Sequence, residues 1–221
     1  MNGFKVESGA DGDRFTIMRQ RMVAEQIRDR GVSDQRVLNA MLLVPRHQFT
    51  PEPYRDQAYE DHPLPIGEGQ TISQPYIVAS MLEALNLKPA YKVLEVGAGS
   101  GYVTALLAEL ADRIFSIERH ASLAQGAWQI LAGLGYKNVE IVVGDGSRGL
   151  PEHQPFDAII VSAAAVGLPA PLVSQLSEGG RMIVPVGPAD AQQLQLIHIE
   201  NGQVKISLRE SCRFVPLISE Q

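Results

Sequence analysis

The order of apolar and polar positions divides the chain into a helical first part and a longer alternating part. From residue 15 to residue 30 apolar side chains recur every three or four positions, which predicts an amphipathic helix that ends at Gly31. Ser33 is a good N-cap for a second helix, which Pro45 would end. The segment TPEPY that follows is predicted to be a loop, and Pro75 fits the first turn of a third helix.

The pattern changes near Tyr91 to short apolar runs that alternate with helical segments. In order these are KVLEV, YVTALLAELA, RIFSIE, SLAQGAWQILAGLG, NVEIVVGD, FDAIIVSA, PLVSQLSEGG and RMIVPVG. Such a series predicts a parallel sheet with helices on both faces. The last apolar runs, in QLQLIHIENGQVKISLRES, alternate strictly and are joined at Asn201 and Gly202, which predicts an antiparallel hairpin with a type I′ turn.

Composition narrows the class of protein. A chain of 221 residues with 45% hydrophobic and 20% charged residues suits one globular domain. The net charge of -6 argues against a general nucleic-acid partner. Residues 1–13 lack the pattern of a signal peptide and no run could span a bilayer, so we expect a cytoplasmic monomer with a flexible start and no membrane attachment. The single cysteine, Cys212, excludes an internal disulfide, and the histidines show no ligand spacing, so no metal is expected.

The segment VLEVGAGSGY combines a predicted strand with a glycine turn and the start of a helix. Gly97, Gly99 and Gly101 allow a tight turn and a close approach of a ligand to the backbone. A dinucleotide fingerprint would run G-x-G-x-x-G, but here Tyr102 stands where the last glycine should be. The motif alone leaves open a nucleotide site and a plain strand-to-helix turn.

Two acidic residues at the next strand ends favour the nucleotide site. Glu118 ends the second strand, about 20 residues downstream, where a carboxylate accepts hydrogen bonds from ribose hydroxyls. Asp145 ends the third strand, level with the adenine that such a fold would bind. A dinucleotide and S-adenosyl-L-methionine are the two open cofactors. The antiparallel C-terminal hairpin favours S-adenosyl-L-methionine, because dinucleotide enzymes normally continue into a second parallel half.

Seven segments of the chain together resemble the protein-L-isoaspartate O-methyltransferase family. The most specific is IGEGQTISQP from Ile66. It is preceded by MVAEQIRDRGVSDQRVLNAMLLVPRHQF from Met22 and followed, in the family's order, by VLEVGAGSGY, FSIER, VVGDGSRGLPEHQPFDAIIVSAA, QLSEGGRMIVPVG and RFVPL. The resemblance implies a Rossmann-like, S-adenosyl-L-methionine-dependent methyltransferase fold in a single domain. Residues 14–90 would form an N-terminal helical and substrate-covering segment, and residues 91–221 a mostly parallel cofactor-binding sheet with a C-terminal antiparallel hairpin.

The resemblance also implies roles for individual residues. Ser73 would be the catalytic residue, with Thr71 and Ile72 beside it over the transferred methyl group, and Val215 would border the peptide. The implied cofactor-binding residues are Glu95, Gly97, Gly99, Ser100, Gly101, Glu118, Asp145 and Gly146. Leu150 stands where the family commonly has tryptophan, and Ser162 where it has threonine.

The implied substrate is an isoaspartyl residue in a damaged protein, whose repair through a succinimide the methylation would initiate. Its free α-carboxylate, with a pKa of about 4, is already ionised at neutral pH and needs no general base. For Ser73 a helix N-cap remains the alternative role. A small-molecule O-methyltransferase and a non-catalytic cofactor-binding module remain open. A nucleic-acid amine methyltransferase is disfavoured, because VSAAAV stands where such enzymes carry an Asn/Asp-Pro-Pro-aromatic turn.

Overall fold

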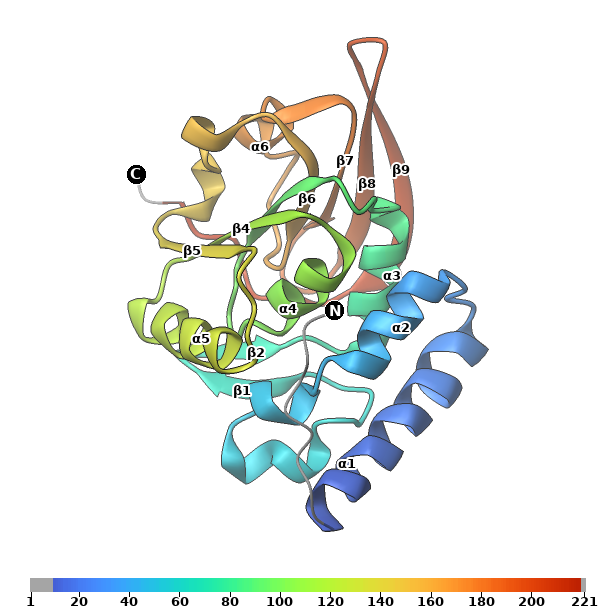
Figure 1. Cartoon of the computed structure of the whole chain (residues 1–221). Coiled ribbons are helices and arrows are strands. Elements are labelled where there is room, and N and C mark those ends of the chain that lie inside the picture. Colours follow the sequence, from blue (N-terminus) through green and yellow to red (C-terminus); the bar gives the residue numbers. More distant parts are fainter. Residues whose placement is uncertain (1–9, 220–221) are drawn as a thin grey trace.

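Seven strands form one mixed sheet in the order β5-β4-β3-β6-β7-β8-β9 (Figure 1). The computed structural model describes residues 10–219. Five strands are parallel: β3 (Lys92–Val96), β4 (Arg113–Glu118), β5 (Val139–Val143), β6 (Phe156–Val161) and β7 (Leu176–Val186). The last two, β8 (Gln192–Glu200) and β9 (Gln203–Cys212), are antiparallel. The predicted parallel sheet with an antiparallel C-terminal hairpin is confirmed.

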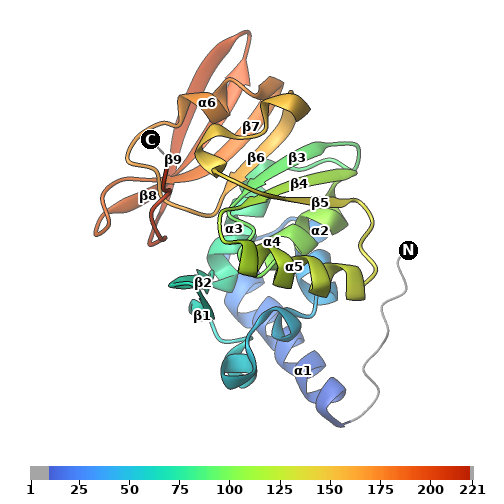
Figure 2. The same cartoon turned by 90° about the vertical axis from the view of Figure 1, so that its left-hand side faces the viewer.

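Each face of the sheet has its own hydrophobic core, because neighbouring residues of a strand point to opposite faces. Val93 packs under α3 (Pro75–Leu85), α4 (Tyr102–Leu110) and α5 (Ala121–Gly133). Leu94 packs on the opposite face, under α6 (Ala170–Val173) and the short turns η5 (Gly146–Arg148) and η6 (Pro151–His153). Figure 2 shows the two groups of helices on either side of the sheet. The near-continuous apolar runs of the sequence therefore serve two cores at once.

The N-terminal helices extend the first of these cores. The α-helix α1 (Ala10–Arg21) continues as a π-helical turn, η1 (Met22–Ile27), and a 3₁₀ turn, η2 (Arg28–Arg30). Gly31, with φ of 103°, ends the run as predicted. Met22 and Ile27 are fully buried in the core that α3 and α4 share. Residues 10–13 belong to α1 and residues 1–9 lie outside the described residues, so the expected flexibility of 1–13 stays a prediction.

Three local predictions were wrong. Asp34, not Ser33, caps α2 (Gln35–Leu43), because its carboxylate accepts a 2.8 Å hydrogen bond from the Arg36 amide. The segment TPEPY, expected to be a loop, follows the 3₁₀ turn η3 (Arg46–Phe49) and includes the start of a second 3₁₀ turn, η4 (Glu52–Gln57). Residues 176–180, expected in a helix, belong to β7, so that α6 is a single turn.

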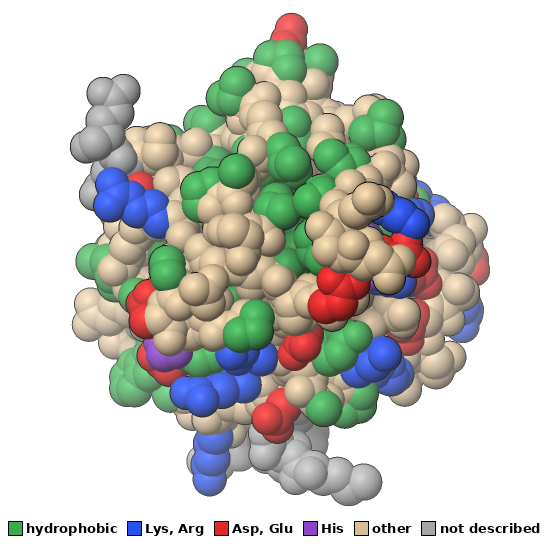
Figure 3. All heavy atoms as spheres, turned by 90° about the horizontal axis from the view of Figure 1, so that it is seen from above, with side chains coloured by type: hydrophobic (Ala, Val, Ile, Leu, Met, Phe, Trp, Pro, Cys, Tyr) green, Lys and Arg blue, Asp and Glu red, His purple; other side chains and the backbone are tan. Residues whose placement is uncertain are grey.

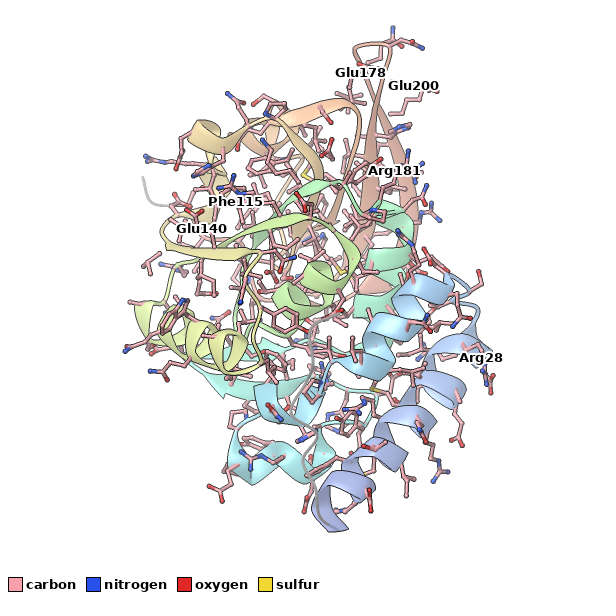
Figure 4. The ribbon with its side chains drawn as sticks, viewed as in Figure 1. Arg28, Phe115, Glu140, Glu178, Arg181 and Glu200 are labelled. Carbon is pink, nitrogen blue, oxygen red and sulfur yellow. The ribbon has the colours of Figure 1, made fainter. Side chains whose placement is uncertain are left out.

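The sequence analysis also missed a small hairpin, β1 (Leu64–Gly67) and β2 (Gln70–Ile72), which lies outside the main sheet. Glu68 and its two neighbouring glycines all have positive φ at its tip, which is why glycines flank the turn. The predicted turn of the other hairpin is confirmed, with Asn201 and Gly202 at φ of 54° and 71°. Glu178 of β7 accepts hydrogen bonds from both amides, at 2.6 and 3.0 Å (Figure 4).

The surface mixes charged and apolar side chains. On the face seen in Figure 3 hydrophobic side chains gather toward the middle, and acidic and basic ones are interspersed around them. Within residues 10–219 no helix has the length and apolar character that crossing a membrane requires.

Candidate active site

A cavity opens at the carboxyl ends of β3, β4 and β6, the edge of an α/β sheet where ligands bind. It holds about 820 Å³ of empty space, including solvent-open volume. Seven segments line it: residues 70–73, 96–100, 102–103, 117–119 and 162–163, the glycine at 146, and residues 215–218. The fold thus brings the opening of α3, the glycine turn and the C-terminal segment to one place.

The glycine turn forms the floor of this cavity. The amides of Gly97 and Ala98 both donate to the carbonyl oxygen of Ile117, at 2.8 and 3.1 Å, which ties the turn to the end of β4. Gly97 and Gly99 have φ of 92° and 53°, so their backbone faces the cavity without a Cβ. Ser100 also lines the cavity.

Gly101 has a packing role that the sequence did not indicate. It is not among the residues that line the cavity but caps α4, and a Cβ there would lie 3.0 Å from the Cβ of Ala127 on α5. The glycine is needed for the close packing of α4 on α5. Its expected contact with the cofactor stays a prediction.

Glu118 presents a nearly buried carboxylate to the cavity. One oxygen accepts a 2.8 Å hydrogen bond from the Gly99 amide and the other a 2.9 Å bond from the His120 amide. The side chain is held in one orientation, and about four lone-pair positions on a carboxylate leave acceptor capacity for a ligand. It can therefore accept hydrogen bonds from a pair of hydroxyl groups.

Glu95 lies behind the glycine turn and is not among the residues that line the cavity, so its expected place near the cofactor stays a prediction. Its side chain is fully buried, and one carboxyl oxygen is paired with the hydroxyls of Thr104 (2.5 Å) and Ser116. Desolvation raises the pKa of the Glu95 carboxyl to about 8, against the smaller effect of these hydrogen bonds. At neutral pH the carboxyl is mainly protonated and uncharged. Its hydrogen bonds to Ser116 and Thr104 link β3 to β4 and to α4.

Gly146 lines the cavity beyond the end of β5. A Cβ at this position would lie 2.5 Å from Cγ1 of Val96, so only glycine fits there without a shift. The adjacent Asp145 is not among the lining residues, and its carboxylate accepts a 2.9 Å hydrogen bond from the Ser147 amide as the cap of η5. Its contact with an adenine stays a prediction. Leu150 is buried in the core under α6.

A second cavity meets the first at the residues that follow the β1–β2 hairpin. Its walls are Pro63, Gln74, Ile77 and residues 211–215, together with residues of the first cavity. Thr71, Ser73, Ser162 and Val215 line both cavities and so form the wall between them. Ile72 lines only the first.

The alternative role of Ser73 as a helix cap is not seen. Gln74 occupies the N-cap position of α3, and no side chain caps that helix end. The carbonyl oxygen of Ser73 instead accepts a 2.8 Å hydrogen bond from Nη2 of Arg46.

The C-terminal segment is fixed beside Ser73 by backbone pairing with the residues after β6. The amide of Ala164 donates to the carbonyl of Val215 at 2.7 Å, and the amide of Leu217 donates back to the carbonyl of Ala164 at 2.8 Å. Sequence reasoning missed several lining residues, among them Gln70, Tyr102, Arg119, Leu217 and Ile218. Each lies in or next to a segment that the sequence analysis quoted, but only the fold shows which side chains of that segment face inward.

This sheet with its glycine turn and strand-end carboxylate is an α/β methyltransferase fold. The chain matches the family model described as protein-L-isoaspartate(D-aspartate) O-methyltransferase over residues 18–221, and it belongs to that family. A protein-L-isoaspartate O-methyltransferase of Syntrophus aciditrophicus (strain SB) is 56% identical over 211 residues, which cover 94% of this chain and 97% of the relative. That of Koribacter versatilis (strain Ellin345) is 52% identical over 207 residues, which cover 94% and 93%.

Solved structures agree with this assignment. One protein-L-isoaspartate O-methyltransferase superposes with a TM-score of 0.82 at 30% identity, over 91% of this chain and 66% of the longer solved chain. A Plasmodium falciparum protein described as a member of this family, crystallised with S-adenosyl-L-homocysteine, superposes with a TM-score of 0.80 at 29% identity. That match covers 90% of this chain and 98% of the Plasmodium chain.

Proposed function

We propose that the two adjoining cavities are the cofactor site and the acceptor site of one carboxyl methyl transfer. The activity is that of the family: a methyl group passes from S-adenosyl-L-methionine to the free α-carboxylate of an L-isoaspartyl residue in a protein or peptide, which initiates repair through a succinimide. The single observation that supports the arrangement is the shared wall, because Thr71, Ser73, Ser162 and Val215 face both spaces.

The residues of the first cavity fit S-adenosyl-L-methionine, which when bound supplies a methyl group on a sulfonium. Glu118 would accept hydrogen bonds from the ribose hydroxyls, since its own backbone donors leave acceptor positions free. Gly97, Gly99 and Ser100 would hold the rest of the cofactor along the turn, where the exposed backbone permits close approach. Asp145 and Gly146 would lie at the adenine.

The chain's own contribution to the reaction is to bind and align the acceptor. The acceptor carboxylate has a pKa of about 4, so it arrives as an anion. Among the described residues, neither cavity is lined by a histidine or a lysine, the usual general bases beside carboxylates. The hydroxyls of Ser73 and Thr71 would donate hydrogen bonds to the carboxylate and fix its direction. The acceleration of methyl transfer then comes from the alignment of the carboxylate and the exclusion of water.

A small-molecule carboxyl or hydroxyl O-methyltransferase is the alternative, since it would use the same first cavity. The second cavity favours a peptide acceptor, because it adjoins Ser73 and is lined by residues 211–215 and Pro63, apart from the cofactor cavity. The decisive experiment offers the protein two matched peptides, one with isoaspartate and one with normal aspartate. Methyl transfer should be much faster to the isoaspartyl peptide, whose carboxylate stands one methylene closer to the chain. Equal rates would refute the repair activity and leave a generic carboxyl methyltransferase.

We also propose that the protein acts as a cytoplasmic monomer. Residues of one chain line both cavities, and the single cysteine suits a reducing compartment. Sedimentation velocity at working concentration should give one species of the mass of one chain, and a stable dimer would contradict the proposal.

A further inference from the structure

Arg46 is the largest of the fully buried side chains, with no exposed area. It lies in η3, and among the described residues the ion pairs include none of Arg46; Asp61, whose charge acts on Arg46 from a distance, is paired with Arg30. Burial lowers the pKa of its guanidinium, which still remains charged at neutral pH. A buried cation without a counter-ion is costly for folding, so this arginine calls for an explanation beyond stability.

The contacts of Arg46 lead to the wall of the active site. Nε donates to the carbonyl of Ala58 at 2.7 Å, and Nη2 donates to the carbonyl of Ser73 at 2.8 Å. The guanidinium carbon lies 4.8 Å from the ring centroid of Tyr102, which lines the first cavity. One side chain therefore joins the backbone of Ser73 to a second residue of the same cavity.

The residue after Ser73 is held from another direction. The side-chain amide of Gln74 donates to Oδ2 of Asp61 at 2.7 Å, and the Tyr76 amide donates to Oδ1 of the same carboxylate at 3.2 Å. Asp61 thus fixes the start of α3, but it makes no contact with Ser73. Among the described residues, Arg46 is the side chain that bonds to the Ser73 backbone.

We propose that Arg46 is a positioning residue for the methyl transfer. Its planar guanidinium holds the Ser73 carbonyl at a fixed distance from the Tyr102 ring, and so holds the Ser73 hydroxyl at the wall between the two cavities. A displacement of about 1 Å at such a position can slow a reaction ~100-fold. The inference rests on the proposed role of Ser73 in aligning the acceptor.

Two variants separate the geometry of Arg46 from its charge. Arg46→Met keeps an unbranched side chain and removes the charge together with the hydrogen bonds to the carbonyls of Ala58 and Ser73. Arg46→Lys keeps the charge but lacks the planar fork that reaches two carbonyls at once. Arg36→Met is the matched control, because Arg36 also donates to a backbone carbonyl, but its partner Leu87 lines neither cavity.

We expect kcat on an isoaspartyl peptide to fall about 10- to 100-fold in Arg46→Met and less in Arg46→Lys. The KM for peptide and the Kd for S-adenosyl-L-homocysteine should change less than about threefold, which a general loss of structure would not produce. Arg36→Met should keep its kcat. Unchanged kcat in Arg46→Met, or an equal loss in Arg36→Met, would overturn the inference. If Arg46→Met does not fold, Arg46→Lys carries the same comparison.

Hydrogen exchange provides a readout that does not need activity. Amides of residues 70–76 should exchange faster in Arg46→Met than in the unaltered protein, while those of β3 and β4 keep their protection. Unchanged exchange at residues 70–76 would refute the link between Arg46 and Ser73. If the unaltered protein did not methylate isoaspartyl peptides but this exchange effect was present, the proposed substrate would be wrong and the Arg46 contact right.

Discussion

Ser122 donates a hydrogen bond of 2.7 Å from its hydroxyl to Oε1 of Glu68, which joins the tip of the β1–β2 hairpin to the first turn of α5. The hairpin leads directly into Gln70, Thr71 and Ile72, which line the first cavity. The contact therefore ties the hairpin that leads into one wall of that cavity to α5.

The first prediction concerns the release of the cofactor product. Glu68→Ala should speed dissociation of S-adenosyl-L-homocysteine about 2- to 10-fold, the effect of one partly exposed hydrogen bond. Stopped-flow displacement measures this rate. Glu25→Ala removes a similarly exposed carboxylate, paired with Arg21 on the N-terminal helices, and should leave the rate unchanged. Equal rates in Glu68→Ala and the unaltered protein would show that the hairpin tip does not control release.

Glu118 should dominate the affinity for the cofactor. Glu118→Ala removes one or two charge-assisted hydrogen bonds, each of about 1.5 to 3 kcal/mol, and should weaken S-adenosyl-L-methionine binding about 10-fold or more. Titration calorimetry measures the change, with Glu140→Ala on β5 as the control. Affinity within twofold of the unaltered protein would refute the assignment, as would comparable binding of NADH.

The buried Glu95 should make stability depend on pH. Its folded-state pKa of about 8 lies above the ordinary value of 4.5, so its contribution is complete below pH 4.5 and is lost as the pH rises through 8. The loss is on the order of 5 kcal/mol. Glu95→Gln stays neutral and should be more stable than the unaltered protein at pH 9. Denaturant unfolding at several pH values tests this, and parallel pH slopes for both proteins would contradict it.

Ser73 should matter for turnover rather than for cofactor binding. Ser73→Ala should lower kcat on an isoaspartyl peptide about 10- to 1000-fold, the range for losing one positioning donor. The Kd for S-adenosyl-L-homocysteine should stay within about threefold. Ser174→Ala, on the surface near α6, is the control. Complete loss of cofactor binding in Ser73→Ala would show that the residue is structural.

The pH profile of methyl transfer should reflect the acceptor alone. The rate should fall on the acid side as the peptide carboxylate protonates near a pKa of about 4, without a rising limb near neutrality that a histidine base would impose. Circular dichroism at each pH separates this from unfolding. A rising limb between pH 6 and 7 would indicate a base that the cavity linings do not contain.

The sequence was most informative where the local pattern and the fold agree. The apolar runs of 93–96 and 114–117 and the glycines between them predicted a sheet edge with a ligand site, because strand ends and turns are local properties. The same logic placed Glu118 correctly at the end of β4. The family resemblance added Ser73 and Val215, which chemistry alone could not select.

What the sequence missed depends on contacts between distant segments. Gly101 and Glu95 belong to the same motif as Gly97 but face away from the cavity. A Cβ at Gly101 would point at α5, and the side chain of Glu95 is bonded to α4. The motif does not state which way each residue faces. Nor could the pattern reveal that Arg46 reaches Ser73, because 27 residues and a hairpin separate them in the chain.

The pairing of Ala164 with Val215 and Leu217 has a consequence for how the protein is made. A ribosome synthesises a chain from its N-terminus at about 5 to 20 residues per second, so residues 215–218 are added several seconds after the glycine turn. Until they are made and paired, one wall of the cofactor cavity is missing. Cofactor binding is therefore expected to stabilise chiefly the completed chain and to contribute little to the early folding of the nascent sheet.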